Sequence, residues 1–161
     1  IDNNNVVSAE SAYLTPGKTG KHVVILGAGL VGVELGIYLA MLGRGVTIVE
    51  MAPCMNDGGN FLHASGLRVQ IKKYGLDIHC STRAEEITDS GVRCTSPDGE
   101  TFFPADTIIY AVGQKPQDES ALALNMCAPE FYMLGDCVTP KNITNATSAA
   151  FTIAMDIGVE R

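Results

Sequence analysis

The sequence predicts an α/β fold: a Rossmann-like three-layer ββα/βαβ nucleotide-binding domain with a small antiparallel meander. An apolar run at 22–26 leads into the glycine-rich turn 27–32, a helix-compatible stretch follows, and a second apolar run ends at Glu50. This order of strand, turn, helix and strand is typical of a parallel sheet. From Arg83 the apolar pattern approaches a period of two, which indicates short antiparallel strands.

The turn Gly27-Ala28-Gly29-Leu30-Val31-Gly32 has the GxGxxG spacing of dinucleotide-binding folds. In that motif the first glycine makes the tight turn, the second lets the backbone approach a pyrophosphate, and the third lets the helix pack closely on the strand. The N–H groups and the dipole at the start of the helix favour a bound anion. We therefore expect residues 27–32 to bind a dinucleotide. The alternative is an ordinary strand–helix turn with chance glycines.

Glu50 indicates which dinucleotide is bound. It follows Gly27 at close to the spacing of about 20 residues at which an acidic residue binds the adenosine ribose. A carboxylate there can accept both ribose hydroxyls, whereas it would repel a 2′-phosphate. Residues 51–55 bring no Lys or Arg to offset that repulsion. The sequence therefore predicts NAD(H) rather than NADP(H), with Glu50 and Met51 beside the cofactor.

Length and composition limit the other possibilities. The chain has 161 residues, enough for one domain or for one domain and a fragment of another. Its apolar content of 46% suits a buried core, and no apolar run reaches the roughly 20 residues of a membrane span. The net charge of −7 argues against nucleic acid as a partner. We expect a protein that binds neither nucleic acid nor membrane.

The cysteines and histidines suggest no site of their own. Five cysteines without CxxC spacing argue against a disulfide scaffold, a zinc site and a thioredoxin-type pair. They suit a reducing compartment, and the polar start IDNNN is unlike a signal peptide, so we expect a cytoplasmic location. His63 and His79 have no partners at metal-ligand or catalytic spacing, and we expect ordinary surface or packing roles for them.

Three segments follow from a reading of the chain in order. Residues 1–20 are polar and contain Pro16-Gly17, which predicts a linker with at most a short extended piece at 5–8. Residues 21–116 hold the nucleotide-binding domain. After a loop at 52–60, its further predicted elements are a helix at 61–73 and strands at 76–80, 85–89, 91–96, 101–104 and 107–112.

The end of the last strand is a second candidate part of the site. Ala111, Val112 and Gly113 close a fully apolar run. The simple interpretation is a turn that only ends the strand. We favour a turn that borders the ligand crevice, because ligands of such folds bind outside the carboxyl ends of parallel strands.

Residues 117–161 do not fit the preceding domain. They predict a connection, a short strand at 131–134, a Gly135-Asp136 turn and a helix at 142–157. A trailing strand without its own sheet would expose unpaired backbone groups, which recruit partners. We therefore expect this segment either to fold back on the preceding domain or to pair with a second copy of the chain, and we favour association into a homodimer.

Three motifs together resemble a known family. The run GAGLVGVELGIYLAMLGRGVTIVE, the later AVGQKP and the terminal FYMLGDC with its helix are similar to the pyridine nucleotide–disulfide oxidoreductase superfamily of flavoproteins. The resemblance implies that residues 21–116 are the NAD(H) domain and that residues 117–161 end with a strand–GD–helix fragment of an FAD domain. It also implies that Glu34 lies near the nicotinamide and that Gly135 and Asp136 contact the flavin.

The resemblance also shows what this chain lacks. A complete member carries an earlier GxGxxG for FAD and, in disulfide reductases, an active-site cysteine pair. Neither is found here. FAD would therefore bind only in the full-length protein, together with the remainder of the FAD domain, and the isolated chain would be inactive, with no catalytic residue of its own.

Within the superfamily, residues 52–75 and 135–158 are most similar to the C-terminal part of enoate reductase and 2,4-dienoyl-CoA reductase type enzymes. These enzymes carry an old-yellow-enzyme-like FMN barrel and an iron–sulfur cluster. Lipoamide dehydrogenase is similar through GVELG and TIVE. The resemblance thus implies hydride transfer from NADH to FAD, and final reduction of an α,β-unsaturated substrate by the intact enzyme.

Two other functions remain open at this point. The chain could be the NADH-binding part of a disulfide reductase or NADH oxidase type flavoenzyme, or a non-catalytic NADH-sensing module. A self-sufficient small dehydrogenase is disfavoured, because no Tyr-x-x-x-Lys or Ser/His pair supplies a general acid after the nucleotide fold.

Overall fold

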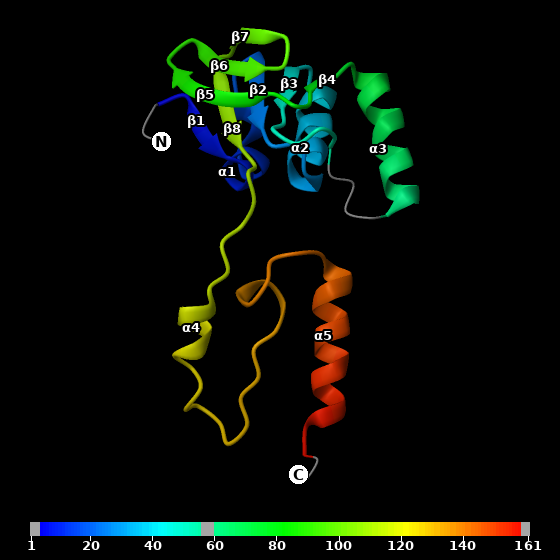
Figure 1. Cartoon of the computed structure of the whole chain (residues 1–161), viewed down its shortest axis with the longest axis vertical. Coiled ribbons are helices and arrows are strands. Elements are labelled where there is room, and N and C mark those ends of the chain that lie inside the picture. The colour runs from blue at the N-terminus through cyan, green and yellow to red at the C-terminus, as the bar shows by residue number, and fades with distance from the viewer. Residues whose placement is uncertain (1–3, 56–59, 159–161) are drawn as a thin grey trace. The chain divides into compact units, whose positions relative to one another are not determined.

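The computed structural model describes residues 4–55 and 60–158, which fall into two compact units divided between Gly113 and Gln114. The first unit contains two sheets and three α-helices, and the second contains two α-helices (Figure 1). The sequence places the corresponding boundary after Pro116, three residues later. Among the described residues, no helix combines the length and the hydropathy that crossing a membrane requires.

A five-stranded parallel sheet forms the centre of the first unit. Its strand order is β1-β8-β2-β3-β4, and every pairing is parallel. The strands are β1 (Val6–Ser8), β2 (His22–Leu26), β3 (Gly45–Val49), β4 (Asp77–His79) and β8 (Thr107–Tyr110). The helices that connect them are α1 (Ala9–Leu14), α2 (Leu30–Met41) and α3 (Phe61–Tyr74). This arrangement confirms the predicted α/β fold.

A three-stranded antiparallel sheet covers one face of the parallel sheet. It confirms the predicted meander. It consists of β5 (Arg83–Thr88), β6 (Gly91–Ser96) and β7 (Gly99–Pro104), in that spatial order. Both connections are tight, since Thr88 pairs with Gly91 and Ser96 pairs with Gly99. The pairing register of β5 shifts once, between Ala84 and Glu86.

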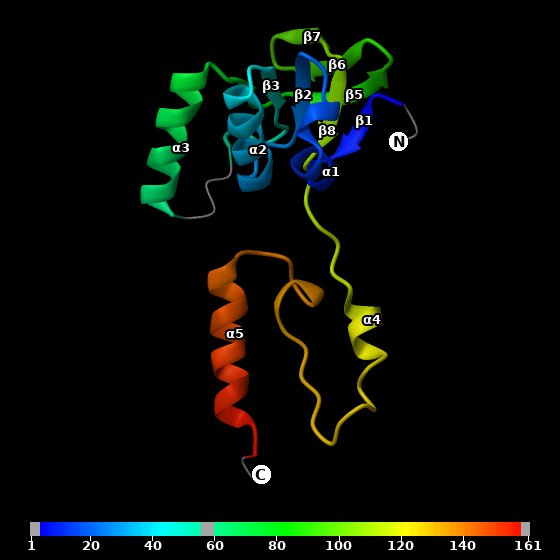
Figure 2. The same ribbon diagram turned by 180° about the vertical axis from the view of Figure 1, so that it is seen from behind.

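The alternating side chains of β2 explain why the first unit has three layers, namely helices, parallel sheet and antiparallel sheet. Val23 and Ile25 belong to a buried cluster that includes α2 residues such as Leu35. Val24 and Leu26 belong to a second cluster, with residues of the antiparallel sheet. Because successive side chains of a strand point to opposite faces, one strand supplies both cores. Figures 1 and 2 accordingly show α1 and α2 on one face of the parallel sheet and the meander on the other.

The linker expected at 1–20 is only partly right: the extended piece expected at 5–8 forms a strand, and a helix that was not predicted follows it. Residues 6–8 form β1, which pairs with β8 through Val6 opposite Ile108. Ser8 then caps α1 by accepting the Ser11 N–H at 3.1 Å. The polar composition concealed this element because α1 contributes only small apolar residues, such as Ala12, to the core. A short edge strand also leaves little periodicity to detect.

The second unit contains α4 (Asp118–Leu122), the 3-10 turn η2 (Gly135–Cys137) and α5 (Ile143–Asp156). Helix α5 lies where the sequence predicts it, and the strand expected at 131–134 does not form. A strand needs a hydrogen-bonding neighbour, and the described residues of this unit contain no other strand that could supply one. None of residues 114–158 is buried. Their large exposed apolar side chains include Leu124, Met126, Ile143, Phe151 and Met155.

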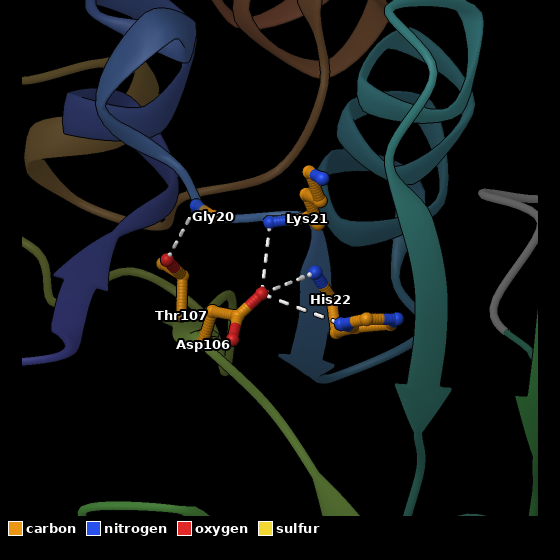
Figure 3. A network of polar contacts seen from close by, with 5 residues as sticks. All are labelled: Gly20, Lys21, His22, Asp106 and Thr107. Carbon is orange, nitrogen blue, oxygen red and sulfur yellow. Dashed lines mark hydrogen bonds and ion pairs between the residues drawn. The ribbon is translucent and has the colours of Figure 1, made fainter.

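A polar network links the residues at the start of β2 with those at the start of β8 (Figure 3). The Asp106 carboxylate accepts the backbone N–H groups of His22 at 2.8 Å and Lys21 at 2.9 Å. The Gly20 N–H donates to the buried Thr107 hydroxyl at 2.9 Å. A Cβ on Gly20 would overlap the Asp106 side chain, so glycine is required for this approach. These bonds fix the register in which β2 and β8 begin.

The Asp106 network predicts an acid-sensitive contribution to stability. The His22 N–H, followed by the Lys21 N–H, holds the pKa of Asp106 below its ordinary 3.8. A lowered pKa in the folded state means that the contribution is complete above 3.8 and is lost as the pH falls through the folded-state pKa. In thermal melts, Asp106→Asn should therefore be less stable than wild type at neutral pH, and the difference should shrink in acid.

Asp98→Asn is the matched control, because Asp98 lies in the exposed turn between β6 and β7. Its difference from wild type should stay small throughout the pH range. A gap between wild type and Asp106→Asn that is constant with pH would contradict this account.

Candidate functional site

The glycine turn joins the carboxyl end of β2 to α2 and requires glycine at two positions. Gly27 has a φ of +105°, and a Cβ there would lie 2.6 Å from the Ala111 carbonyl oxygen. A Cβ on Gly32 would overlap the Gly27 carbonyl oxygen. The turn is also held from one side, because the Gly27 N–H donates to the Val49 carbonyl at 2.8 Å. The start of α2 therefore lies directly against the ends of β2 and β8.

Gly29 differs from these two glycines. A Cβ on Gly29 would meet no atom within 4 Å, and its φ of −72° is open to any residue. Gly29 is the N-cap of α2, and no side chain of the described residues caps this helix. The first N–H groups of a helix have no partner within it, and an anion in this open space would satisfy them. The residues concerned include Leu30 and the half-exposed Val31.

Glu50 follows β3 and connects the glycine turn to the next loop. One carboxylate oxygen, Oε2, accepts the Ala28 N–H at 2.7 Å, and the other, Oε1, accepts the Ala52 N–H at 2.7 Å. Each oxygen keeps a second lone pair with which it can accept a hydroxyl. The carboxylate thus lies against the turn, while the next side chain, Met51, is 71% exposed. Contact of Glu50 with a ribose stays a prediction.

Glu34, on the first part of α2, has a partner that the sequence did not indicate. Its Oε1 lies 2.8 Å from Nε2 of His63, in the first turn of α3. Both side chains are a little more than two-fifths exposed. On the side of α1, burial and the charge of Glu34 raise the pKa of Tyr13, whose ring stacks on Tyr38. No local sequence signal could reveal this pair, since its members are 29 positions apart on two helices.

The remaining predicted residues fall at two places. Ala111, Val112 and Gly113 follow β8, and a Cβ on Gly32 would also lie 3.4 Å from the Ala111 methyl group. Val112 is 73% exposed and Gly113 has a φ of +106°. Gly135 and Asp136 belong to the second unit, where the Asp136 carboxylate accepts the Lys141 N–H at 3.3 Å. Their predicted contact with a flavin stays a prediction.

Comparison with known proteins connects this geometry to a family. The model of the family described as pyridine nucleotide-disulphide oxidoreductase matches residues 3–150. Cinnamate reductase of Clostridium sporogenes is 29% identical over 157 residues, which cover 96% of this chain and 24% of that protein. The nitric oxide reductase FlRd-NAD(+) reductase of Vibrio vulnificus is 32% identical over 152 residues, which cover 83% of this chain and 39% of that protein.

The fold also matches solved structures. A complex of 2-naphthoyl-CoA reductase with 2-naphthoyl-CoA covers the whole chain with a TM-score of 0.88 at 24% identity, which shows a shared fold. The chain spans about a quarter of the length of that protein and of cinnamate reductase.

Replacement of Gly29 tests the open space at the start of α2. Gly29→Val should abolish NADH binding and leave the melting temperature almost unchanged, because its side chain would enter the space of the pyrophosphate while its Cβ meets no protein atom within 4 Å. Gly17→Val is the matched control, since a Cβ there also meets nothing and the site is not involved. Calorimetric titration and thermal melts measure the two effects. A folded Gly29→Val protein that binds NADH normally would make the turn purely structural.

Glu50 should determine the preference for NADH. Glu50→Ala should weaken NADH binding by roughly 1.5–3 kcal/mol, the value of one hydrogen bond to a charged group. Glu50→Gln keeps an acceptor oxygen but removes the charge that repels a 2′-phosphate, so it should raise NADPH affinity relative to NADH. Parallel titrations with both dinucleotides measure the ratio. Equal binding of NADPH and NADH by wild type would remove the argument.

Proposed function

We propose that this chain, which belongs to the pyridine nucleotide-disulphide oxidoreductase family, binds NADH so that hydride passes to FAD in a larger flavoenzyme. The membership confirms the resemblance that the three motifs indicate. The chain is thus a nucleotide-binding domain of a flavin oxidoreductase. This favours an enzymatic role over a non-catalytic sensor.

The observation that carries the proposal is the junction of the glycine turn with Glu50. The Ala28 N–H donates to Glu50, so the residue proposed for the pyrophosphate side and the residue proposed for the ribose are in direct contact. Both lie at the carboxyl end of the parallel sheet, where such folds bind ligands. The residues fit the dinucleotide: the space at Gly29 is open and the start of α2 has no side-chain cap.

The chain's own contribution is to bind and orient. Bound NADH supplies a hydride and FAD accepts it. The N–H groups at the start of α2 would hold the pyrophosphate, and Glu50 the adenosine ribose, while Glu34 would lie towards the nicotinamide. Gly135 and Asp136 would contribute to the FAD site only with the rest of that domain, because none of residues 114–158 is buried in this chain.

We further propose an enoate-type reductase as the intact enzyme. The similarity to cinnamate reductase over 96% of the chain supports this choice. The final substrate would then be an α,β-unsaturated acid or thioester, and an FMN barrel and an iron–sulfur cluster would lie outside these 161 residues. The alternative is a flavoenzyme of the disulfide reductase or NADH oxidase type. The likeness to the Vibrio vulnificus NAD(+) reductase favours it.

The isolated chain should bind NADH without oxidising it. We expect one NADH per chain by calorimetry, no flavin absorbance in the purified protein, and no consumption of NADH with an enoate or quinone acceptor.

The exposed apolar side chains of α5 should make the chain self-associate. A chain ending at Pro116 should be monomeric by light scattering and still bind NADH. Stoichiometric flavin, or a truncated chain that no longer binds NADH, would contradict the proposal.

A further inference from the structure

We propose that Cys54 and Cys80 are a thiol pair that a hydroperoxide converts into an intramolecular disulfide, and that this disulfide weakens NADH binding. The effect on NADH rests on the proposed function, whereas formation of the disulfide does not. The two cysteines lie in segments that follow the carboxyl ends of the neighbouring parallel strands β3 and β4, and Glu50 is in the first of these segments.

Backbone hydrogen bonds hold the two segments together. The Glu50 N–H donates to the His79 carbonyl and the Thr82 N–H donates to the Glu50 carbonyl, both at 2.8 Å. One step further, the Ser81 N–H donates to the Ala52 carbonyl at 2.8 Å. Ser81 has a φ of +50°, which is uncommon for a residue other than glycine and keeps the chain turned towards this loop. The loop after β3 and the segment after β4 are therefore fastened on both sides of Cys80.

Cys80 and Cys54 flank the point where the two segments meet: Ser81 follows Cys80, and its hydrogen-bond partner Ala52 is two residues before Cys54. Burial raises the pKa of Cys80 most, the charge of Cys54 adds to this rise, and the Met55 N–H opposes it. A disulfide needs Cα atoms about 4.4–6.8 Å apart and a suitable side-chain rotation. Formation of the bond therefore requires the loop after Ala52 to bring Cys54 within this distance of Cys80. Both thiols are free in the structure, so the bond is available to form.

Their surroundings give the two thiols different roles. Cys54 is exposed, whereas Cys80 is partly buried, and burial, followed by the charges of Cys54 and Glu50, raises the pKa of Cys80. Because the thiolate is the nucleophile, the exposed Cys54 should attack first and Cys80 should follow.

The two steps balance with a hydroperoxide as the oxidant. The Cys54 thiolate attacks one peroxide oxygen, the O–O bond breaks, and a sulfenic acid forms while the leaving oxygen takes up a proton. The Cys80 sulfur then attacks the sulfur of Cys54, the S–O bond breaks, and its proton leaves with the hydroxide as water. With hydrogen peroxide, two thiols lose two electrons and two protons, and the peroxide becomes two water molecules.

The disulfide would change the position of the loop that supports Glu50. The Ala52 N–H holds Glu50 Oε1 at 2.7 Å, and Ala52 is two residues before Cys54. Drawing Cys54 onto Cys80 shifts this donor and fixes the loop beside the proposed adenosine site. Loss of about one hydrogen bond to a charged group corresponds to about tenfold weaker NADH binding.

Peptide mapping tests the pair without any nucleotide. Cleavage after Lys and Arg places Cys54 alone in the peptide 45–68 and Cys80 alone in the peptide 74–83. After treatment of the reduced chain with hydrogen peroxide and alkylation of the remaining thiols, these two peptides should be joined and lighter by two hydrogens. The link should be absent in Cys54→Ser and Cys80→Ser and present in Cys127→Ser, which removes another exposed cysteine. Oxidation of Cys54 to sulfinic acid without the link would overturn the proposal.

Calorimetry of the reduced and oxidised chains then tests the effect. The oxidised wild type should bind NADH about tenfold more weakly, a reducing dithiol should restore binding, and Cys80→Ser should show no change with peroxide. An oxidised chain that carries the link and binds NADH as tightly as the reduced chain would overturn the regulatory part. A reduced chain that binds no NADH would instead contradict the proposed function, and the mapping result would stand independently.

Discussion

The close approach of α2 to the ends of β2 and β8 is the constraint on which the first unit depends. It requires glycine at 27 and 32, because a side chain at either would collide with backbone carbonyls. The approach brings the uncapped start of α2 to the carboxyl end of the sheet, and the same turn gives its Ala28 N–H to Glu50. The packing of α2 on the sheet and the geometry of the proposed dinucleotide site therefore depend on the same glycines. Gly29 is the exception, because a Cβ there would meet no protein atom within 4 Å, and this is the space that we propose for the ligand.

The sequence predicted the parts of the fold that have strong local signals. The apolar runs of β2 and β3, the glycine turn and the tight turns of the meander each carry a pattern within a few residues, and all lie where predicted. Helix α1 was missed because its buried residues, Ala9 and Ala12, are small and set in a polar segment. The strand expected at 131–134 does not form, for the opposite reason. Its apolar side chains are present, but the described residues of the second unit contain no neighbouring strand with which it could pair.

The site was predictable only where chemistry follows from spacing. The position of Glu50 against the turn follows from the length of one strand–helix–strand unit. The contact of Glu34 with His63 depends on how α3 packs on α2. The hydrogen bond from Ser81 to Ala52, which brings Cys80 towards the loop that carries Cys54, depends on the path of that loop. Neither leaves a recurring pattern in the sequence. Functional residues that meet through tertiary packing therefore needed the structure.

The pairing of β1 with β8 has a mechanical consequence. These two strands are parallel neighbours, with Val6 opposite Ile108 and Ser8 opposite Tyr110. The chain enters β1 at its amino end and leaves β8 at its carboxyl end, so tension between residue 5 and Gly113 pulls the two strands along each other. Their hydrogen bonds then share the load instead of opening one at a time.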